Sequence, residues 1–487
     1  MTESLTKKAL HGLKWSYIST FTTALMQIGY TAVMARILTP ADFGLVAMGS
    51  VVLSFGNYFA QMGMGSAIIQ KKDITKEQIK AVFTSSVLLG IFFFVLTFLI
   101  APLLKYVFDN QDVIPLVRVM GLSFLLNGFS LTPLALIRRE LQFKALATAE
   151  IISFFVGYII IGIASALVGF GVWSLVFASL IQSVLIMAIT FLIIRHELTL
   201  SFSWTHYKPL FSYGSRVSII SFLEFIGSSL DTIVIGRYFG SSQLGIYNRA
   251  QMLINVPLQY FTSSFSRVLF PSFSRIQNDK ERIRANIIFI LQIISIIIFP
   301  FTILVVVLSK EIVEILLGPK WLDAAPLLKY LAFAAAVNLL THFIAVLFEA
   351  KGLLKQKIII QTFFIVILAI SFYFALEYGV YAFTIALLIC HISRLCHYMF
   401  LFLREFKIGY LEMFEHFVPP GFTSLIVLIL TLLFYRYIIT LDIPTYAVLG
   451  FTLCMFVTVY LFLVFSKLNS NIMNTLINKY AILKDLV

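Results

Sequence analysis

The sequence has little charge, few cysteines and none of the common signatures of an enzyme. Only 12% of its 487 residues are charged while 60% are hydrophobic, which excludes an ordinary soluble globular protein. The three cysteines all lie in apolar segments, so we expect buried thiols rather than a disulfide framework or a metal site. Neither a Gly-x-x-x-x-Gly-Lys-Ser/Thr phosphate loop nor a Gly-x-Ser-x-Gly elbow occurs. We therefore expect a membrane protein that is not an enzyme.

Long apolar runs take the place of the missing charge. Runs such as 87–104 and 287–308 are close to the ~20 residues that a helix needs to cross hydrocarbon about 30 Å thick. They do not alternate apolar and polar residues, which excludes the strands of a membrane barrel. We therefore predict an all-α integral membrane protein with about 14 transmembrane helices. The expected helices cover residues 12–35, 42–66, 82–107, 113–137, 146–168, 170–194, 209–238, 244–272, 285–309, 324–350, 356–376, 379–403, 417–440 and 443–466.

The first part of the chain is repeated further along. Residues 76–81, Lys-Glu-Gln-Ile-Lys-Ala, return as residues 280–285, Lys-Glu-Arg-Ile-Arg-Ala, at an offset of 204. Further matches hold at an offset of 201 upstream and 211 downstream: Thr31, Val33, Arg36 and Gly44 with Thr232, Val234, Arg237 and Gly245, then Pro115, Leu116, Arg118 and Asn127 with Pro326, Leu327, Lys329 and Asn338. Six helices per copy give both copies one orientation. The repeat predicts two six-helix bundles related by an axis along the membrane normal, a common transporter plan.

The repeat also divides the chain. We expect an N-terminal bundle at 1–194, a linker at 195–209 and a C-terminal bundle at 210–403, followed by two additional helices within 417–466 and a tail at 467–487. Most of the 36 lysines and arginines fall on the side that holds both chain ends, and cytoplasmic segments are enriched in these residues. We therefore expect both termini in the cytoplasm. The net charge of +13 is then a topology signal, and no nucleic acid partner is expected.

Four stretches of the sequence resemble a known transporter family. They are Lys-Lys-Ala-Leu-His-Gly-Leu-Lys-Trp-Ser at 7–16, Ala-Arg-Ile-Leu-Thr-Pro-Ala-Asp-Phe-Gly-Leu at 35–45, Gly-Met-Gly-Ser-Ala-Ile-Ile-Gln at 63–70 and Asp-Thr-Ile-Val-Ile-Gly-Arg-Tyr-Phe-Gly at 231–240. In these stretches the chain resembles the polysaccharide transporter branch of the MOP superfamily, the Wzx-type flippases of lipid-linked oligosaccharides. The resemblance extends over about the whole chain and is closest to the colanic-acid and exopolysaccharide exporter group.

The resemblance implies a flippase for the assembly of surface polysaccharide, such as O-antigen, capsule or exopolysaccharide. Its substrate would be an undecaprenyl-diphosphate-linked oligosaccharide repeat unit, moved by alternating access from the inner to the outer leaflet of the bacterial plasma (inner) membrane. The implied partners are this lipid-linked oligosaccharide and membrane lipids, with a polysaccharide polymerase and a chain-length regulator as candidate protein partners. No cofactor is expected, and H+ or Na+ is the candidate coupling ion.

Two other functions stay open from the sequence. A cation-coupled drug or metabolite antiporter of the same superfamily would usually need twelve helices, whereas this chain has two more and a cationic interior. A membrane glycan polymerase or transferase would need an external catalytic loop with acids and arginines, and the loops here are short. Both features favour the flippase.

Charged side chains within the expected helices are the candidates for substrate contact. A charge at mid-membrane costs about 2.5–3.5 kcal/mol, so such residues usually face a cavity or a partner. Arg249 and Arg267 lie about five helical turns apart on one face, with Gln259 near it, and guanidinium groups can bind a diphosphate. The candidate substrate-binding residues are Arg249, Arg267, Arg394, Gln259, His391, Asn338, Arg36 and Arg237. The structural alternatives are anchoring at the membrane interface, snorkelling to the headgroups and pairing with an acid on a neighbouring helix.

Glu224 and Asp231 are the candidates for ion coupling. They lie two helical turns apart on the same face of the helix expected at 209–238, and either can bind a proton or a cation. The alternative is a structural ion pair, for example between Glu224 and Arg394. His391 and His397 flank Arg394 at three-residue spacing, but the arginine argues against zinc, so no metal is expected.

Overall fold

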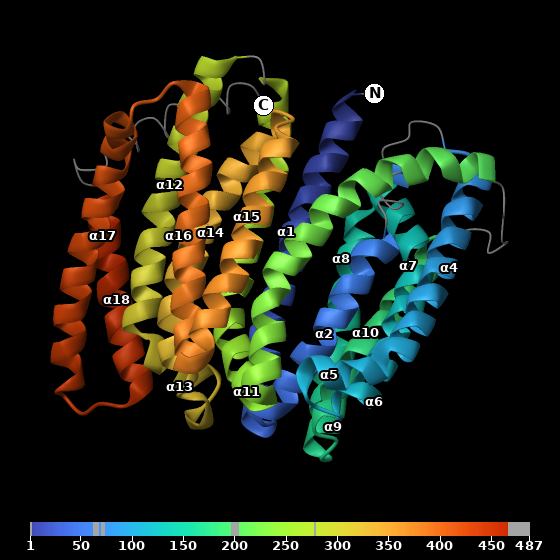
Figure 1. The fold of residues 1–487 in the computed structure, drawn as a ribbon, viewed down its shortest axis with the longest axis horizontal. Helices are drawn as coiled ribbons and strands as arrows, with labels where there is room; N and C mark the ends of the chain where they lie inside the picture. Colours follow the sequence, from blue (N-terminus) through green and yellow to red (C-terminus); the bar gives the residue numbers. More distant parts are fainter. Residues whose placement is uncertain (1, 62–67, 70–73, 196–203, 277–278, 466–487) are drawn as a thin grey trace. The chain divides into compact units, whose positions relative to one another are not determined.

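The described parts of the chain are built from helices and contain no strand (Figure 1). The computed structural model describes residues 2–61, 68–69, 74–195, 204–276 and 279–465. The predicted all-α fold class is confirmed. The first helices are α1 (Thr2–Ile37), α2 (Pro40–Gln61), α4 (Lys76–Ile100), α5 (Leu104–Phe108), α6 (Val113–Met120), α7 (Leu122–Arg139), α8 (Phe143–Phe154), α9 (Ile163–Leu167), α10 (Val172–Ile193) and α11 (Trp204–Arg275). They are followed by α12 (Lys280–Val307), α13 (Ser309–Leu316), α14 (Ala324–Ala350), α15 (Leu354–Ala375), α16 (Val380–Phe406), α17 (Tyr410–Ile439) and α18 (Thr445–Val464).

Ten helical stretches of the described chain are long and apolar enough to cross a membrane. They correspond to ten of the expected spans and establish a multi-pass membrane protein. Of the other four expected spans, 12–35 lies in α1, 209–238 and 244–272 lie in α11, and the described part of 42–66 lies in α2. Of the long helices, α1 and α11 have the most polar composition. These four spans are also the first two of each expected bundle.

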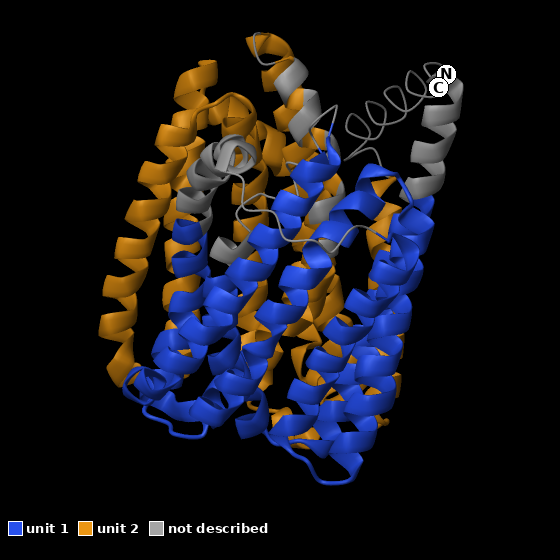
Figure 2. Cartoon of the chain, turned by 90° about the vertical axis from the view of Figure 1, so that its right-hand side faces the viewer, with its two compact units in different colours: residues 1–248 blue, residues 249–487 orange. Residues whose placement is uncertain are grey.

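The chain forms two compact units, Met1–Asn248 and Arg249–Val487, shown in blue and orange in Figure 2. The first part of α11 packs with the first unit, where Arg237 donates a hydrogen bond to the carbonyl oxygen of Tyr106 over 2.6 Å. The bundle limits expected from the repeat stay predictions. Residues 196–203 of the expected linker and the expected tail at 467–487 lie outside the described residues.

The helix ends follow the offsets of the sequence repeat. Each repeated string begins a helix, α4 in the first copy and α12 in the second, and the preceding residue caps that helix. The Thr75 hydroxyl accepts a hydrogen bond from the amide of Gln78, and the Asp279 carboxylate accepts one from the amide of Arg282. At the offset of 211, the positions Val113, Arg139 and Phe143 at the ends of α6, α7 and α8 correspond to Ala324, Ala350 and Leu354 at the ends of α14 and α15. The duplication is therefore present in the backbone as well as in the sequence.

The two copies contact each other at a pair of glycines within the first unit. α11 is interrupted at Gly240, whose φ of 78° favours glycine, one residue before the position that corresponds to the start of α2. A Cβ added to Gly44 in α2 would lie 1.8 Å from the backbone oxygen of Ser241. A Cβ added to Gly245 in α11 would lie 1.8 Å from the backbone oxygen of Pro40. At the offset of 201, Gly44 corresponds to Gly245 and Pro40 corresponds to Ser241, so each contact is the repeat equivalent of the other. The packing is therefore reciprocal, as at a twofold interface.

The second unit has one large apolar core, and α17 and α18 pack beside it. The core includes Phe343 and Phe348 of α14 together with Tyr398 and Phe402 of α16. In Figure 1, α17 and α18 (red) run beside α12, and α13 follows the far end of α12. In each unit we call one end of the helices the basic end and the other the opposite end. The basic end is where α4 and α8 begin in the first unit, and where α12, α15 and α17 begin in the second.

Candidate functional site

The two arginines that are repeat mates, Arg36 and Arg237, are exposed and held by nearby backbone at the opposite end. Arg36 donates a hydrogen bond over 2.8 Å to the Ala32 carbonyl in its own helix. Arg237 donates to the Tyr106 carbonyl, and its Nη1 lies 3.9 Å from the Asp109 carboxylate. These contacts agree with the anchoring alternative. Their part in substrate binding stays a prediction.

The buried acid Asp231 joins the two segments of α11. Its side chain is 5% exposed, and the hydroxyl of the buried Tyr247 donates a hydrogen bond to it over 2.6 Å. Asp231 precedes the break at Gly240 and Tyr247 follows it, so the pair fixes the angle between the segments. Glu224 lies two turns earlier and is half-buried. The geometry of Asp231 agrees with a structural role, and ion coupling by either acid stays a prediction.

Arg394 and His391 on α16 meet at one aromatic ring of α15. The guanidinium carbon of Arg394 lies 4.8 Å from the centre of the Phe364 ring, and the His391 ring lies 5.2 Å from it. Both side chains are half-buried. A cation over an aromatic face is stabilised by about 0.5–2 kcal/mol. Glu349 of the neighbouring α14 forms an ion pair with the buried Lys357. The alternative of an ion pair between Glu224 and Arg394 stays a prediction.

The remaining predicted residues are spread over α11 and α14. Arg249 is half-buried at the start of the second unit, with Nη1 3.2 Å from the sulfur of Met252. Gln259 and Asn338 are exposed amides on α11 and α14. The side chain of Arg267 lies outside the described residues. The stripe from Arg249 to Arg267 therefore stays a prediction.

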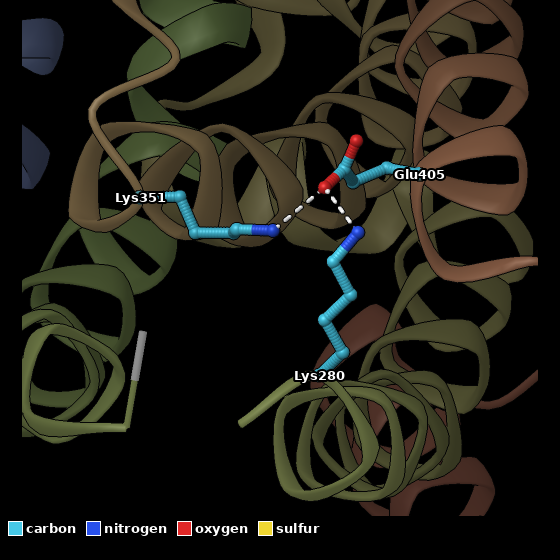
Figure 3. Close-up of polar contacts among 3 residues, drawn as sticks. All are labelled: Lys280, Lys351 and Glu405. Atoms are coloured by element: carbon cyan, nitrogen blue, oxygen red, sulfur yellow. Dashed lines mark hydrogen bonds and ion pairs between the residues drawn. The ribbon is translucent and has the colours of Figure 1, made fainter. Parts of the chain in front are cut away.

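A charge network at the basic end of the second unit was not predicted from the sequence. Glu405 accepts a hydrogen bond from Lys351 over 2.9 Å and lies 3.2 Å from the ammonium group of Lys280 (Figure 3). The Lys351 side chain is 10% exposed, against 62% for Lys280. Arg284 and Glu412 form a further ion pair between α12 and α17. The number of lysines and arginines on each side of the membrane can be counted from the sequence, but the acids that pair with them lie on other helices and cannot be identified in this way.

Two acids in or next to the membrane helices were also missed. Glu150 in α8 accepts a hydrogen bond over 2.8 Å from the buried Ser19 of α1. Glu311 in α13 is 5% exposed and accepts one from Tyr435 of α17 over 2.7 Å. Both lie within two or three turns of a helix end, where the sequence suggests solvent. A list of every acid in an expected span would have included Glu150.

Known proteins are similar to this chain in sequence and in fold. Residues 33–326 match a family described as "Polysaccharide biosynthesis protein". The chain is 29% identical over 403 residues to an uncharacterized membrane protein in the cps region of Klebsiella pneumoniae, covering 82% of this chain and 83% of that protein. It is 27% identical over 355 residues to the lipopolysaccharide biosynthesis protein WzxC of Escherichia coli K12, covering 72% and 71%. The lipid II flippase MurJ, in an inward closed conformation, has the same fold, with a TM-score of 0.75 and 18% identity over 93% of this chain and 98% of that chain.

Proposed function

The chain belongs to the polysaccharide biosynthesis protein family, and from this premise we propose that it flips lipid-linked oligosaccharides. The substrate is an undecaprenyl-diphosphate-linked repeat unit, moved from the inner to the outer leaflet of the bacterial plasma membrane for surface polysaccharide assembly. The observation that carries the proposal is the family match over residues 33–326. The similarity of this chain to WzxC, a lipopolysaccharide biosynthesis protein, also supports a lipid-linked oligosaccharide as the substrate. The protein forms and breaks no covalent bond in this process.

The duplicated backbone supports transport by alternating access. A repeat of two copies with one orientation is a common plan of transporters that work by alternating access. In this proposal the basic end faces the cytoplasm, because positive residues gather there. The contact of Gly44 and Gly245 then lies toward the outer face, where it holds the first helices of both copies together. The lipid tail stays in hydrocarbon while the polar head crosses along the more polar helices α1 and α11.

The substrate chemistry fits the predicted residues. The Phe364 ring orients the guanidinium of Arg394, and a guanidinium fork matches the oxygens of a phosphate. Arg249 and Arg267 would hold the diphosphate in the same way. The exposed amides of Gln259 and Asn338 suit sugar hydroxyls. Glu224 and Asp231 would tune or couple the motion, with H+ or Na+ as the ion.

The experiment is a deletion strain complemented with a charge-removal series. We expect the deletion to accumulate completed lipid-linked repeat units on the inner leaflet, and the unaltered gene to restore surface polysaccharide. Removal of a charged hydrogen bond to phosphate, about 1.5–3 kcal/mol, predicts a tenfold or greater loss of export in Arg249→Ala, Arg267→Ala and Arg394→Ala. Arg436→Ala, at an exposed position near the opposite end of α17, is the matched control and should export normally.

Each contrary outcome identifies a different error. Normal export by all three arginine variants, at normal protein levels, would show that the site residues are wrong while the function stands. A deletion strain that lacks complete repeat units would indicate an enzyme earlier in the assembly. Normal polysaccharide together with changed drug susceptibility would indicate the antiporter.

A further inference from the structure

The two additional helices help to bury a carboxylate that the proposed transport path does not use. Glu311 of α13 is 5% exposed, and its Oε1 accepts the hydrogen bond from the Tyr435 hydroxyl of α17. Its Oε2 is buried and has no hydrogen-bond partner among the described residues. Within the same residues, no lysine, arginine or histidine forms an ion pair with Glu311. This carboxylate is therefore buried with one hydrogen bond and no countercharge from the described chain.

Two threonine hydroxyls of the same helix pair are buried without partners as well. Thr431 lies one turn before Tyr435, on the same face of α17, and Thr452 lies on α18. Both residues are 0% exposed, and neither hydroxyl has a hydrogen-bond partner in the described part of the chain. The two helices are joined by a short turn, and at ~1.5 Å per residue both threonines lie about 10–12 Å from it. The two hydroxyls therefore lie at about the same distance from this connection, and one helical turn further from it than Tyr435.

These polar groups lie between the opposite end of the helices and an apolar layer. Glu314, one turn of helix from Glu311, accepts a hydrogen bond over 3.3 Å from the hydroxyl of Thr445 at the start of α18. Val427 and Phe456 lie one helical turn further from the connection between α17 and α18 than the threonines, and both are buried against α12. The polar positions thus continue toward the opposite end and stop at the apolar layer. An ion that reached them would come from the opposite end.

A bare carboxylate in this position is unstable, because its desolvation costs more than one hydrogen bond from a phenol returns. We propose that Glu311 binds one positive charge, a proton or Na+, at a site formed with Tyr435, Thr431 and Thr452. A single carboxylate balances a single charge, and all the side-chain ligands are oxygens, which hard cations prefer. Of the other charged side chains near this end of α13, α14 and α17, the acid Glu314 is half-buried, and the remaining ones are exposed: Lys310, Asp323, Lys329 and Arg436.

This site gives the additional helices a role that is independent of the substrate. The carboxylate comes from the core bundle, whereas the phenol and both threonines come from α17 and α18. Binding of the cation would hold the helix pair against α13, because it links ligands from all three helices. The inference does not rest on the flipping of a glycolipid, and a failure of either leaves the other intact.

The experiment uses the purified full-length protein in detergent or nanodiscs. If the ion is Na+, replacing choline by Na+ at constant ionic strength raises the Tm of the unaltered protein. Glu311→Gln abolishes this rise, and Glu314→Gln, the same change one turn away, keeps it. If the ion is a proton, Na+ has no effect, and the infrared spectrum at neutral pH contains a band of a protonated carboxyl group that Glu311→Gln removes and Glu314→Gln keeps.

A second variant keeps the test decisive where Glu311→Gln does not fold. Tyr435→Phe retains the carboxylate and removes its hydrogen bond, so it should shift the Na+ concentration for the half-maximal rise in Tm by about tenfold, or shift the infrared band. The proposal is overturned if the unaltered protein has neither a Na+ response nor a protonated carboxyl band. It is also overturned if either signal persists unchanged in the Glu311 or Tyr435 variant.

Discussion

The two copies of the repeat begin corresponding helices in the same way and then anchor them differently. In the first copy, Thr75 and Gln78 cap the start of α4 through reciprocal hydrogen bonds. In the second, the start of α12 is capped in the same register and is also tied to α16 and the end of α14 through Lys280, Glu405 and Lys351. Duplication therefore preserved the backbone frame, and in the second copy a charge network is built onto it. A helix end fixed by a cap and a network of three charges moves less easily than it would with the cap alone.

The largest effect is expected at the glycine contact that both copies share. Gly44→Ala and Gly245→Ala each place a methyl group 1.8 Å from a backbone oxygen that cannot rotate away. Overpacking of this kind costs about 1–3 kcal/mol or more, and thermal unfolding of the purified protein measures it. The two losses should be equal, and the double variant should lose less than their sum, because both residues act at one contact.

Gly29→Ala is the matched control for this contact. It is also a helical glycine, but a Cβ there meets no atom within 4 Å. Its Tm should change little. Unequal losses in the two glycine variants would show that the copies do not meet reciprocally.

The next effect is expected at the charge network of the second copy. Glu405→Ala leaves the ammonium group of Lys351 with little solvent and without its carboxylate, at a cost of about 1–3 kcal/mol. Lys280→Ala removes the exposed member of the network and should cost at most about 1 kcal/mol. Chemical unfolding of the purified variants measures both. If both variants lost the same free energy of unfolding, the burial of Lys351 would not determine how much the network stabilises the protein.

The smallest effect is expected at the helix caps, where the copies are alike. Thr75→Ala and Asp279→Ala each remove one cap, at about 0.5–2 kcal/mol. Faster hydrogen exchange at the first amides of α4 and α12 measures the loss of each cap. Thr148→Ala removes only a hydroxyl bonded to its own helix, so it is the control. If α12 frays as much as α4, the network of Lys280 does not hold the helix end.

The sequence predicted most of the fold because the forces that decide it act locally. A run of apolar residues long enough to span the membrane must be helical, since no water is present to satisfy its backbone. The helices expected from 82 and 285 begin earlier, at Lys76 and Lys280, because Thr75 and Asp279 cap them there and the helix continues beyond its apolar run. The break near Gly240 was expected between the spans 209–238 and 244–272. The limits of the bundles followed from the same repeat and stay predictions.

The candidate site was predictable only in part. Spacing along α16 placed Arg394 and His391 on one face, and the structure brings both to Phe364. The partner ring lies on another helix, and nothing in the local sequence identifies it. The acids Glu150 and Glu311 were missed because each lies close to a helix end, where exposure to solvent is the simplest expectation. Their burial results from neighbouring helices that cover them.

The sequence by itself determined the helices, their approximate ends, the duplication and the family that the chain resembles. These depend on hydrophobicity, capping and residue identity, which are properties of short segments. The tertiary structure decided which polar side chains meet: Glu349 with Lys357, Lys351 with Glu405, and Asp231 with Tyr247. It also decided that two repeated glycines meet at a shared contact. Such contacts depend on which helix faces lie together, and that is set by packing of the whole bundle rather than by any one helix.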